Sequence, residues 1–363
     1  MGQKRHRVLF VSLFPPRVGG LALQSELLAH YLQKEGVEVQ KANAHYARSY
    51  QGTLGKVAKA GAQVTALIRA SNRGAKEVDQ IVAAGCSWWG FMPVVVALIM
   101  GRRYGKPVSV IYHGGAAGRF LRVHHWWVGP MLRMADALAV NSHFLREEFA
   151  AYGIETMVVP PVVRFGAVKS RRRGLVLLST RYLEPIYDVA TILKAFVRVQ
   201  AAFPNARLIV AGSGSQQRSL QGFALEHDLR VKFTGHLEAG EIERLLSQGS
   251  FYLNAALVDN FPTSVLEAMN AGTMVITTPV GELPRLMVHG THGLFFVPGD
   301  AESLANTVLY ALSHEEVAAR CREEGQKLAR SFTWDRVRAD YLRLLRLNGM
   351  SEERRRERGS LEH

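Results

Sequence analysis

The stretch SFYLNAALVDNFPTSVLEAMNAGTMVITTP, Ser250 to Pro279, predicts a strand, a helix and a second strand in succession. SFYLNA and TMVITTP are short apolar runs, which are typical of buried parallel strands. The helix between them is expected to begin at Pro262, because proline is tolerated in the first turn of a helix and poorly inside one. A strand–helix–strand unit of this kind belongs to a parallel sheet.

The same alternation continues in both directions along the 363 residues. The further strands that we expect are VLFVSLF (8–14), VEVQ (37–40), PVSVIYHGG (107–115), DALAVNS (136–142), GLVLLST (174–180), ARLIVAGSGS (206–215) and VKFTG (231–235). The pattern predicts an α/β protein with two doubly wound, Rossmann-like domains, because the chain is longer than one typical domain. Ligands of such sheets bind beyond the carboxyl ends of the strands, so two facing domains would offer a cleft.

Composition shifts predict where the domains begin and end. The N-terminal domain is expected over 1–168 and the C-terminal domain over 169–332, joined by the basic linker VKSRRRG (168–174). A last helix over 333–350 is expected to pack back on the N-terminal domain. The charged tail 351–363 is expected to be disordered, and its final Leu-Glu-His looks like an expression-vector scar.

The composition is that of an ordinary globular protein, 48% apolar and 21% charged. Cys86 and Cys321 lack the spacing of a metal site or a disulfide framework, which favours a reducing cytoplasm. The apolar run before Pro15 is short for a signal sequence. FMPVVVALIM (91–100) has half of the roughly 20 residues that a membrane crossing needs. We therefore expect a soluble protein.

The net charge of +14 is concentrated in the first half of the chain. Residues 1–168 hold 20 Lys and Arg against 9 Asp and Glu, whereas residues 169–363 hold 25 against 22. This balance suggests a polyanionic partner, such as nucleic acid, anionic lipid or an acidic substrate, or else a well-solvated surface with no specific partner. No zinc spacing, aromatic RNA-binding signature or helix-turn-helix pattern supports nucleic acid, which we do not expect as a partner.

Glu267 is the most informative polar residue of the opening stretch. It is expected about one turn inside the helix, between Leu266 and Ala268, where an unpaired carboxylate would cost several kcal/mol to bury. The vicinal hydroxyls of a ribose are natural partners, because one carboxylate can accept from both. The N–H groups at the helix start, around Thr263 and Ser264, could hold phosphate or sugar oxygens.

Other positions carry weaker signals. Gly19–Gly20 follows the first strand and either lets a phosphate approach a helix N-terminus or makes a tight turn. GSGS (212–215) lacks the full dinucleotide fingerprint and is interpreted as a structural loop. Arg181 could hold a diphosphate or make a surface ion pair, and His113 is either a site residue or a satisfied polar group.

Together these segments resemble a known family. Arg181, VKFTGHL (231–237), DNFPTSVLEAMNAG (259–272), VITTPVGELPRLMVHGTHGLFFVPGD (275–300) and Gly19–Gly20 look like family-4 retaining glycosyltransferases of the GT-B fold. The resemblance covers nearly the whole chain and is strongest from about Leu175 to Asp300. The family motif is two glutamates separated by seven residues. Asp259 and Glu267 match that spacing, with Asp in place of the first Glu.

The resemblance implies a role for each matched position. Glu267 would bind the ribose of a nucleotide-sugar donor, and Asp259 would face the hydroxyls of the donor sugar. Catalytic roles would fall to Arg181, to Asp259 and to His113 beside the transferred sugar and the acceptor. The remaining donor contacts would come from Gly20 and Arg181 at the diphosphate, His236 and Leu237 at the base, and backbone groups of Asn260, Phe261, Pro262, Thr263 and Ser264.

Two positions depart from the family pattern. Family members usually carry a lysine about five residues after the arginine, and this chain has Ile186 there. The diphosphate would lose one cationic partner. Asp259 is one methylene shorter than Glu, which leaves the identity of the donor sugar open.

The implied reaction is transfer of a sugar from a UDP- or GDP-sugar to an acceptor hydroxyl, with retention of configuration. No cofactor or metal is expected, because no Asp-x-Asp site is present to demand one. The acceptor would be a glycan or a lipid-linked molecule of bacterial envelope polysaccharide or glycolipid synthesis. The enzyme would be cytoplasmic and peripheral at the inner face of the cell membrane, with its anionic surface as a further partner.

The segment 118–138 could mediate that contact. It places Trp126, Trp127 and several Arg and His residues in one helical stretch, which suits an interfacial or acceptor-binding helix or an ordinary partly buried one. Two other functions stay open. One is a nucleotide-sugar epimerase of similar architecture, and the other is a basic, non-catalytic nucleic-acid-binding protein.

Overall fold

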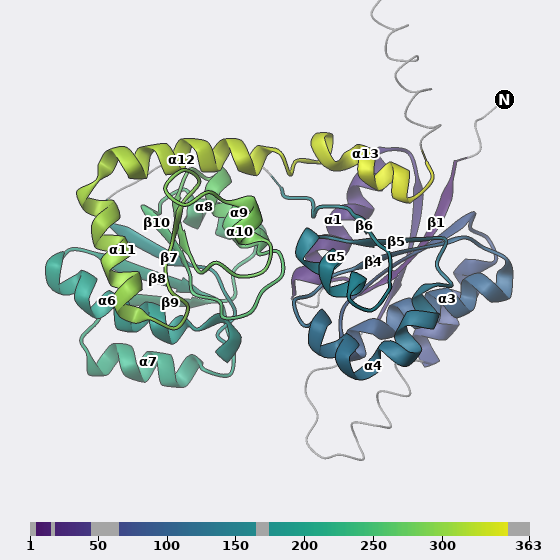
Figure 1. Cartoon of the computed structure of the whole chain (residues 1–363), viewed down its shortest axis with the longest axis horizontal. Helices are drawn as coiled ribbons and strands as arrows, with labels where there is room; N and C mark the ends of the chain where they lie inside the picture. The colour runs from purple at the N-terminus through teal and green to yellow at the C-terminus, as the bar shows by residue number, and fades with distance from the viewer. Residues whose placement is uncertain (1–4, 16–18, 45–64, 165–173, 348–363) are drawn as a thin grey trace, which may run out of the picture. The chain divides into compact units, whose positions relative to one another are not determined.

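The computed structural model describes residues 5–15, 19–44, 65–164 and 174–347. The chain divides into two compact units. The first runs to Val162 and resumes at Trp334, and the second is Val163–Thr333. Each unit is built on a parallel sheet with helices on both faces (Figure 1).

The sheet of the first unit has the order β2-β1-β3-β4-β5-β6, with every described pair parallel. Its strands are β1 (Arg7–Ser12), β2 (Glu38–Asn43), β3 (Gln80–Gly85), β4 (Val108–Tyr112), β5 (Ala137–Val140) and β6 (Met157–Val158). Its helical segments are α1 (Gly20–Lys34), η1 (Trp88–Phe91), α3 (Met92–Tyr104), α4 (Ala117–Leu132), α5 (His143–Ala150) and α13 (Trp334–Leu344), and residues 65–75 are also helical.

Both faces of this sheet are buried because successive side chains of a strand point to opposite sides. In β1, Leu9 and Val11 belong to the core beneath α3, α4 and α5, whereas Val8 and Phe10 belong to the core beneath α1 and α13. An uninterrupted apolar run therefore supplies two layers of packing. This is why the strands read as continuous apolar segments in the sequence.

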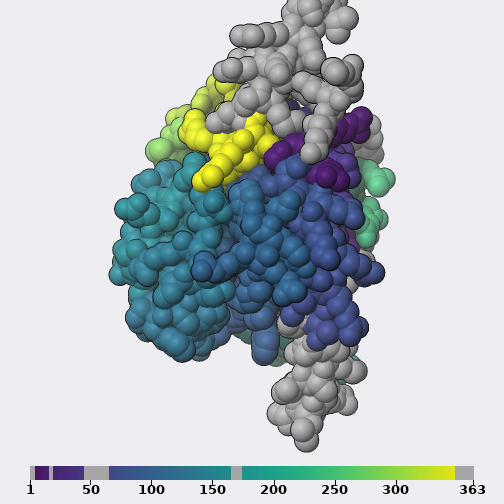
Figure 2. All heavy atoms as spheres, turned by 90° about the vertical axis from the view of Figure 1, so that its right-hand side faces the viewer, coloured from purple at the N-terminus to yellow at the C-terminus, as the bar shows by residue number. Residues whose placement is uncertain are grey.

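Helix α13 completes the first unit, although it follows the second unit in the chain. The Trp334 ring stacks on Tyr31 with centroids 4.9 Å apart, and its Nε1 donates to Glu35 Oε1 at 3.0 Å. Arg338 donates to the other oxygen of Glu35 at 2.7 Å. Figure 2 shows the yellow residues of α13 lying directly against the first unit.

The sheet of the second unit has the order β12-β11-β10-β7-β8-β9, again with parallel pairs. Its strands are β7 (Val176–Ser179), β8 (Arg207–Ala211), β9 (Val231–Gly235), β10 (Phe251–Asn254), β11 (Met274–Thr277) and β12 (Leu294–Phe295). Its helical segments are η2 (Pro185–Tyr187), α6 (Val189–Ala202), α7 (Gln217–Glu226), α8 (Ala239–Leu246), α9 (Thr263–Asn270), α10 (Leu283–Leu286), α11 (Ala301–Ser313) and α12 (Glu315–Arg330).

The nine strands expected from the sequence are all present, and the doubly wound α/β architecture is confirmed. Strands β3, β6 and β12 were not expected. The chain enters the second unit at Val163 rather than at residue 169. Most of the expected linker and the whole charged tail lie outside the described residues. Within the described residues, no helix combines the length and apolar character needed to span a bilayer.

Candidate functional site

The strand order of the second unit places a candidate site at the ends of β7 and β10. Strand β7 is followed by β8 and β9 on one side, while β10, β11 and β12 lie on the other. Ligands of open α/β sheets bind beyond the carboxyl ends of the strands where the order reverses in this way. Arg181 lies two residues beyond β7, and Asp259 lies on the loop between β10 and α9. Two predicted site residues therefore meet at the reversal point.

The Arg181 guanidinium is held on three sides. It forms an ion pair with Asp259, and its Nη1 donates to Ser264 Oγ at 2.8 Å. The Tyr187 ring lies over it, with the guanidinium carbon 4.3 Å from the ring centroid, within the range of a cation–π contact. The Arg181 side chain is only 11% exposed. It is a fixed cation in the site and not a mobile surface charge.

Asp259 uses both of its carboxylate oxygens. Oδ2 faces Arg181, and Oδ1 accepts from the backbone N–H of Asn260 at 2.8 Å. This N–H was expected to face a ligand, and the structure corrects that expectation, since it is taken by the neighbouring carboxylate. Pro262 likewise cannot donate, because proline has no N–H.

Helix α9 begins at Thr263, with Pro262 as its N-cap residue, within one residue of the predicted start. The N–H groups of Thr263 and Ser264 have no acceptor inside the helix, because the first turn of any helix lacks one. Phe261 is buried and packs edge-on against Phe332, with centroids 5.4 Å apart. It anchors the loop in the core and does not present its ring to a ligand.

Glu267 lies one turn inside α9 and is partly exposed. No hydrogen bond or ion pair joins its carboxylate to another of the described residues. Burial raises the pKa of this carboxyl, the Arg181 charge opposes that rise, and Glu243 adds to it. A partly buried carboxyl without a protein partner is costly, so this group is suited to accept hydrogen bonds from a ligand.

Glycine-rich segments fix the loops around this site. A side chain at Gly212 would place its Cβ 2.1 Å from the carbonyl oxygen of Arg181, and one at Gly214 would lie 2.3 Å from that of Leu183. The GSGS loop therefore has the structural role that the sequence indicated, because its glycines allow close packing of the backbone. Gly281, at φ +59°, would bring a Cβ within 2.3 Å of the Asn260 carbonyl oxygen.

The other residues expected at the donor lie at the edge of this region. His236 and Leu237 directly follow β9. His236 is exposed, with Nε2 4.0 Å from Glu238 Oε1, and Leu237 packs against the apolar core beneath α9. Ile186, which stands where the family has lysine, accepts a backbone hydrogen bond from Leu257 at 2.8 Å. That bond ties the Arg181 loop to the loop after β10.

In the first unit, His113 follows β4 and is buried. Its Nδ1 lies 3.1 Å from Asn141 Nδ2. The amide nitrogen can only donate, so Nδ1 accepts and the ring proton lies on Nε2. Burial lowers the pKa of His113 to about 4, which leaves the ring neutral near pH 7. Asn141 and Ser142 were both able to cap the next helix, and Ser142 does so by accepting from the Leu145 N–H.

Gly20 begins helix α1 after β1, where the order of the first sheet also reverses. A Cβ added at Gly19 or Gly20 would meet no described atom within 4 Å. Packing against the described residues therefore does not require glycine at either position. Neither Tyr187, whose ring lies over the Arg181 guanidinium, nor Tyr252 or Gly281 was predicted from the sequence.

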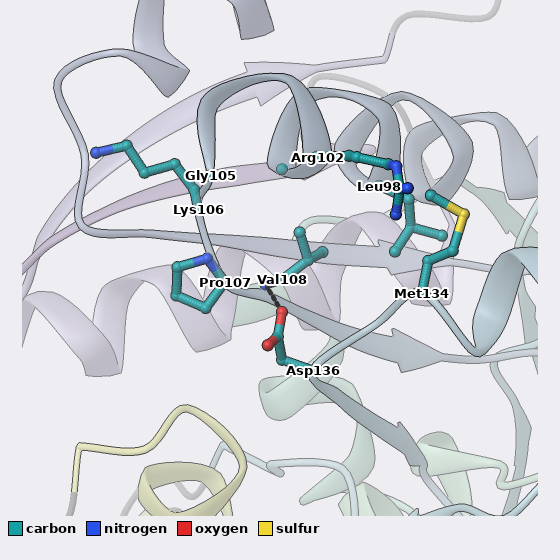
Figure 3. Close-up of a pocket in the computed structure, with 9 residues that line it drawn as sticks. Leu98, Arg102, Gly105, Lys106, Pro107, Val108, Met134 and Asp136 are labelled. Atoms are coloured by element: carbon teal, nitrogen blue, oxygen red, sulfur yellow. Dashed lines mark hydrogen bonds between the residues drawn. The ribbon is translucent and has the colours of Figure 1, made fainter.

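Two surface pockets lie away from these residues. One, of about 320 Å³, lies where α3 ends and β4 begins, at the amino end of the first sheet. Its carboxylate, Asp136, points at the backbone N–H of Val108, 2.8 Å away (Figure 3). The other, of about 620 Å³, lies between β12 and α11. Neither contains a residue expected at the site.

Comparison with known proteins agrees with this fold. Residues 166–328 match the family Glycosyl transferases group 1. The matched region lies within the second unit. A glycogen synthase of Mycobacterium tuberculosis is 27% identical over 265 residues, which are 66% of this chain and 63% of that protein. A phosphatidyl-myo-inositol mannosyltransferase of the same species is 25% identical over 267 residues, 69% and 70% of the two chains. The aligned part of this chain thus spans less than two thirds of the first of these relatives.

Solved structures show the same fold at low identity. HepE of Anabaena, in complex with UDP and glucose, superposes with a TM-score of 0.75 at 19% identity, covering 94% of this chain and 99% of that one. A sucrose-phosphate synthase of Thermosynechococcus elongatus superposes with a TM-score of 0.77 at 16% identity, covering 96% and 100%. The two parallel sheets are those of GT-B glycosyltransferases.

Proposed function

We propose that this protein is a retaining glycosyltransferase that moves a sugar from a UDP- or GDP-sugar to an acceptor hydroxyl. The observation that carries the proposal is Glu267, a partly buried carboxyl with a raised pKa and no hydrogen-bond or ion-pair partner among the described residues. The match of residues 166–328 to Glycosyl transferases group 1 supports it, because the matched region contains Arg181, Asp259 and Glu267. The finer assignment to family 4 belongs to the same proposal.

The donor binds to the second unit. Glu267 accepts hydrogen bonds from the two ribose hydroxyls, while Arg181 and the first N–H groups of α9 hold the diphosphate. Asp259 faces the hydroxyls of the donor sugar. Although both of its oxygens already accept one hydrogen bond, a carboxylate has about four lone-pair sites, so each oxygen can accept another.

The chemical step needs stabilisation of negative charge on the departing diphosphate. Arg181 supplies a pre-oriented cation in a largely buried position, where electrostatic stabilisation is stronger than in water. The acceptor attacks from the leaving-group face, and a diphosphate oxygen takes its proton, which gives retention. The proposal assigns no metal and no cofactor to this step.

The first unit binds the acceptor, and His113 is its candidate catalytic group. With Nδ1 occupied by Asn141 and the ring neutral, His113 offers a single N–H, at Nε2. It can donate a hydrogen bond to a sugar or acceptor oxygen. It is not suited to act as a general acid near neutral pH, because its proton is that of a neutral imidazole.

An anionic membrane surface is proposed as a further partner of the first unit, at the inner face of the cell membrane. Residues 80–135 contain six Lys and Arg and no Asp or Glu. In the same segment Trp89 is 64% exposed and Trp126 is 71% exposed. Trp88 joins η1 to α4, since its ring packs on Phe120 and His124. Exposed tryptophans among cationic residues suit an interface with acidic lipid.

This surface also favours an acceptor of envelope glycan or glycolipid synthesis, which would be presented at a membrane. Trp127, by contrast, packs against Phe91 and is only partly exposed. Of the two adjacent tryptophans of α4, only Trp126 is free to contact a lipid surface.

The test is a panel of donors. Thermal unfolding is measured with UDP, GDP and ADP and their sugars, and the stabilising donors are then incubated with protein to detect released nucleoside diphosphate. A glycosyltransferase releases diphosphate and yields an α-linked product from an α-linked donor, as NMR of the anomeric proton would show. An epimerase would convert the sugar without releasing diphosphate. Nucleic-acid binding without response to any nucleotide would contradict the proposal.

A further inference from the structure

The hydroxyl of Tyr252 lies beneath the candidate donor site and is not assigned by the roles above. Tyr252 is in the middle of β10, and its ring is fully buried beside Leu178 of β7. Its hydroxyl lies 3.1 Å from Thr180 Oγ1, on the residue that precedes Arg181. Burial raises the pKa of this hydroxyl, and the Ser264 side chain, in the first turn of α9, lies close enough to lower it. The strand therefore links the two elements that would hold a diphosphate.

These contacts form a ring around the Tyr252 hydroxyl. Arg181 Nη1 donates to Ser264 Oγ at 2.8 Å, and the Ser264 side chain lies beside the Tyr252 hydroxyl. The Tyr252 hydroxyl in turn contacts Thr180 Oγ1, and the backbone from Thr180 to Arg181 closes the ring. Loss of the hydroxyl would therefore remove a contact that lies between the Arg181 loop and the first turn of α9.

Packing alone does not call for tyrosine at this position. A buried phenol needs a hydrogen-bond partner, whereas phenylalanine would fill the same space between the sheet and α9 without that requirement. The neighbours of the ring are apolar, since it belongs to the core that contains Leu178, Val265 and Leu266. The role of the hydroxyl therefore lies with the polar side chains next to it, those of Thr180, Ser264 and Arg181.

We propose that Tyr252 is a positioning residue of the donor site, whose hydroxyl fixes the Arg181 guanidinium relative to the N-terminus of α9 so that both can bind one diphosphate. The inference rests on the proposed function and extends it to a residue outside the family motif. It also bears on Ile186, because a site without the second cation depends more strongly on the orientation of the first.

The experiment uses the full chain and compares nucleoside diphosphate with nucleoside. Dissociation constants are measured for UDP and GDP, and for uridine and guanosine by competition, with wild type, Tyr252→Phe, Ser264→Ala and the double variant. Tyr341→Phe is the matched control, because it also removes one buried phenol hydroxyl, which donates to the Pro160 carbonyl in the first unit. Urea unfolding followed by circular dichroism checks that each variant is folded.

Tyr252→Phe is expected to weaken the affinity for UDP or GDP about fivefold and to lower the kcat of sugar transfer about tenfold. Its affinity for the nucleosides should not change, and Tyr341→Phe should behave as wild type in every assay. In the double-mutant cycle the two losses should be non-additive, because both substitutions break the same ring. If Tyr252→Phe keeps the affinity and turnover of wild type, or loses affinity for nucleoside and diphosphate equally, this inference is wrong and the proposed function still stands. If wild type binds neither UDP nor GDP, the proposed function fails and this inference with it.

Discussion

Asp259 and Glu267 carry the same functional group in different environments. Asp259 forms an ion pair with Arg181 and accepts from the Asn260 N–H, so its charge is compensated within the protein. Glu267 lies eight residues further on, where burial raises the pKa of its carboxyl and no described side chain pairs with it. The first carboxylate organises the site, and the second is the group that we propose to bind the donor. Spacing alone could not distinguish these two roles.

His113 predicts a pH dependence of stability. The unfolded chain takes up a proton at this residue near pH 6.5 and the folded chain only near pH 4, because burial lowers the pKa. Between these values the unfolded state binds more protons, so the stability present above pH 6.5 is lost as the pH falls toward 4. The loss should approach about 3 kcal/mol.

The five tryptophans of the chain, at 88, 89, 126, 127 and 334, all belong to the first unit. Urea unfolding followed by tryptophan fluorescence at pH 7 and pH 4.5 therefore reports on the unit that contains His113. His113→Gln should show a shallower pH dependence than wild type. Equal slopes for the two proteins would contradict the assignment of a buried, neutral histidine.

At the residue scale, the site residues that could be predicted are those whose position relative to a strand or a helix start is visible in the sequence. The fold predicts that four residues meet at one edge of the sheet. They are Arg181 after β7, Asp259 after β10, and Ser264 and Glu267 near the start of α9. Tyr252 was not singled out, because a tyrosine inside an apolar strand reads as core. Tyr187 was missed because its contact with Arg181 depends on a short helical turn that propensity does not reveal.

At the element scale, the loop after β11 supports the site through close backbone packing. Gly281 has φ +59°, and a Cβ at this position would lie 2.3 Å from the Asn260 carbonyl oxygen and 2.5 Å from that of Asp259. The N–H of Glu282 donates to the same Asn260 carbonyl at 2.8 Å. The loop therefore holds the Asp259 segment from behind, and a side chain at position 281 would push it away.

Gly281→Ala is expected to destabilise the second unit by about 2–3 kcal/mol, through the clash and the left-handed backbone together. Gly299→Ala is the matched control, since Gly299 also has positive φ, +76°, but no neighbouring atom of the described residues would lie within 4 Å of an added Cβ. It should cost only about 1 kcal/mol. The second unit contains no tryptophan, so circular dichroism should detect the change while tryptophan fluorescence does not. Equal effects of the two substitutions would contradict the packing argument.

The elements that the sequence analysis missed share a physical cause. Strand β3, QIVAAG, is entirely buried but is rich in alanine and ends in glycine, so it lacks the β-branched run of its neighbours. Strands β6 and β12 are two residues long and are defined only by pairing with the sheet. Long-range pairing of this kind is not encoded in local propensity.

At the scale of the whole molecule, alternation of strands and helices was sufficient to predict two doubly wound sheets. The unit boundaries were less predictable, because the chain enters the second unit at Val163 and leaves it at Thr333 without a clear change in composition. The return of α13 to the first unit rests on contacts such as Arg338 with Glu35, which are 303 residues apart in the chain. Such contacts have no local signature.

The membrane proposal predicts co-sedimentation with vesicles that contain phosphatidylglycerol and little with pure phosphatidylcholine. Binding should weaken in high salt, because screening reduces attraction between surface charges. Trp89→Ser combined with Trp126→Ser should weaken it about tenfold. Leu225→Ser is the control, because Leu225 is 85% exposed on the second unit. Equal binding to both lipids, or no effect of the tryptophan substitutions, would contradict the proposal.

The most direct test of the account is the affinity of the full chain for UDP and GDP by titration calorimetry, with wild type, Glu267→Gln and Glu243→Gln. We predict that wild type binds one of them and that Glu267→Gln weakens binding about 10- to 100-fold, since it removes a charged acceptor of two hydroxyls. Glu243→Gln, which removes the neighbouring carboxylate that raises the pKa of Glu267, should bind equally or more tightly. Unchanged affinity in Glu267→Gln, or no binding by wild type, would contradict the account.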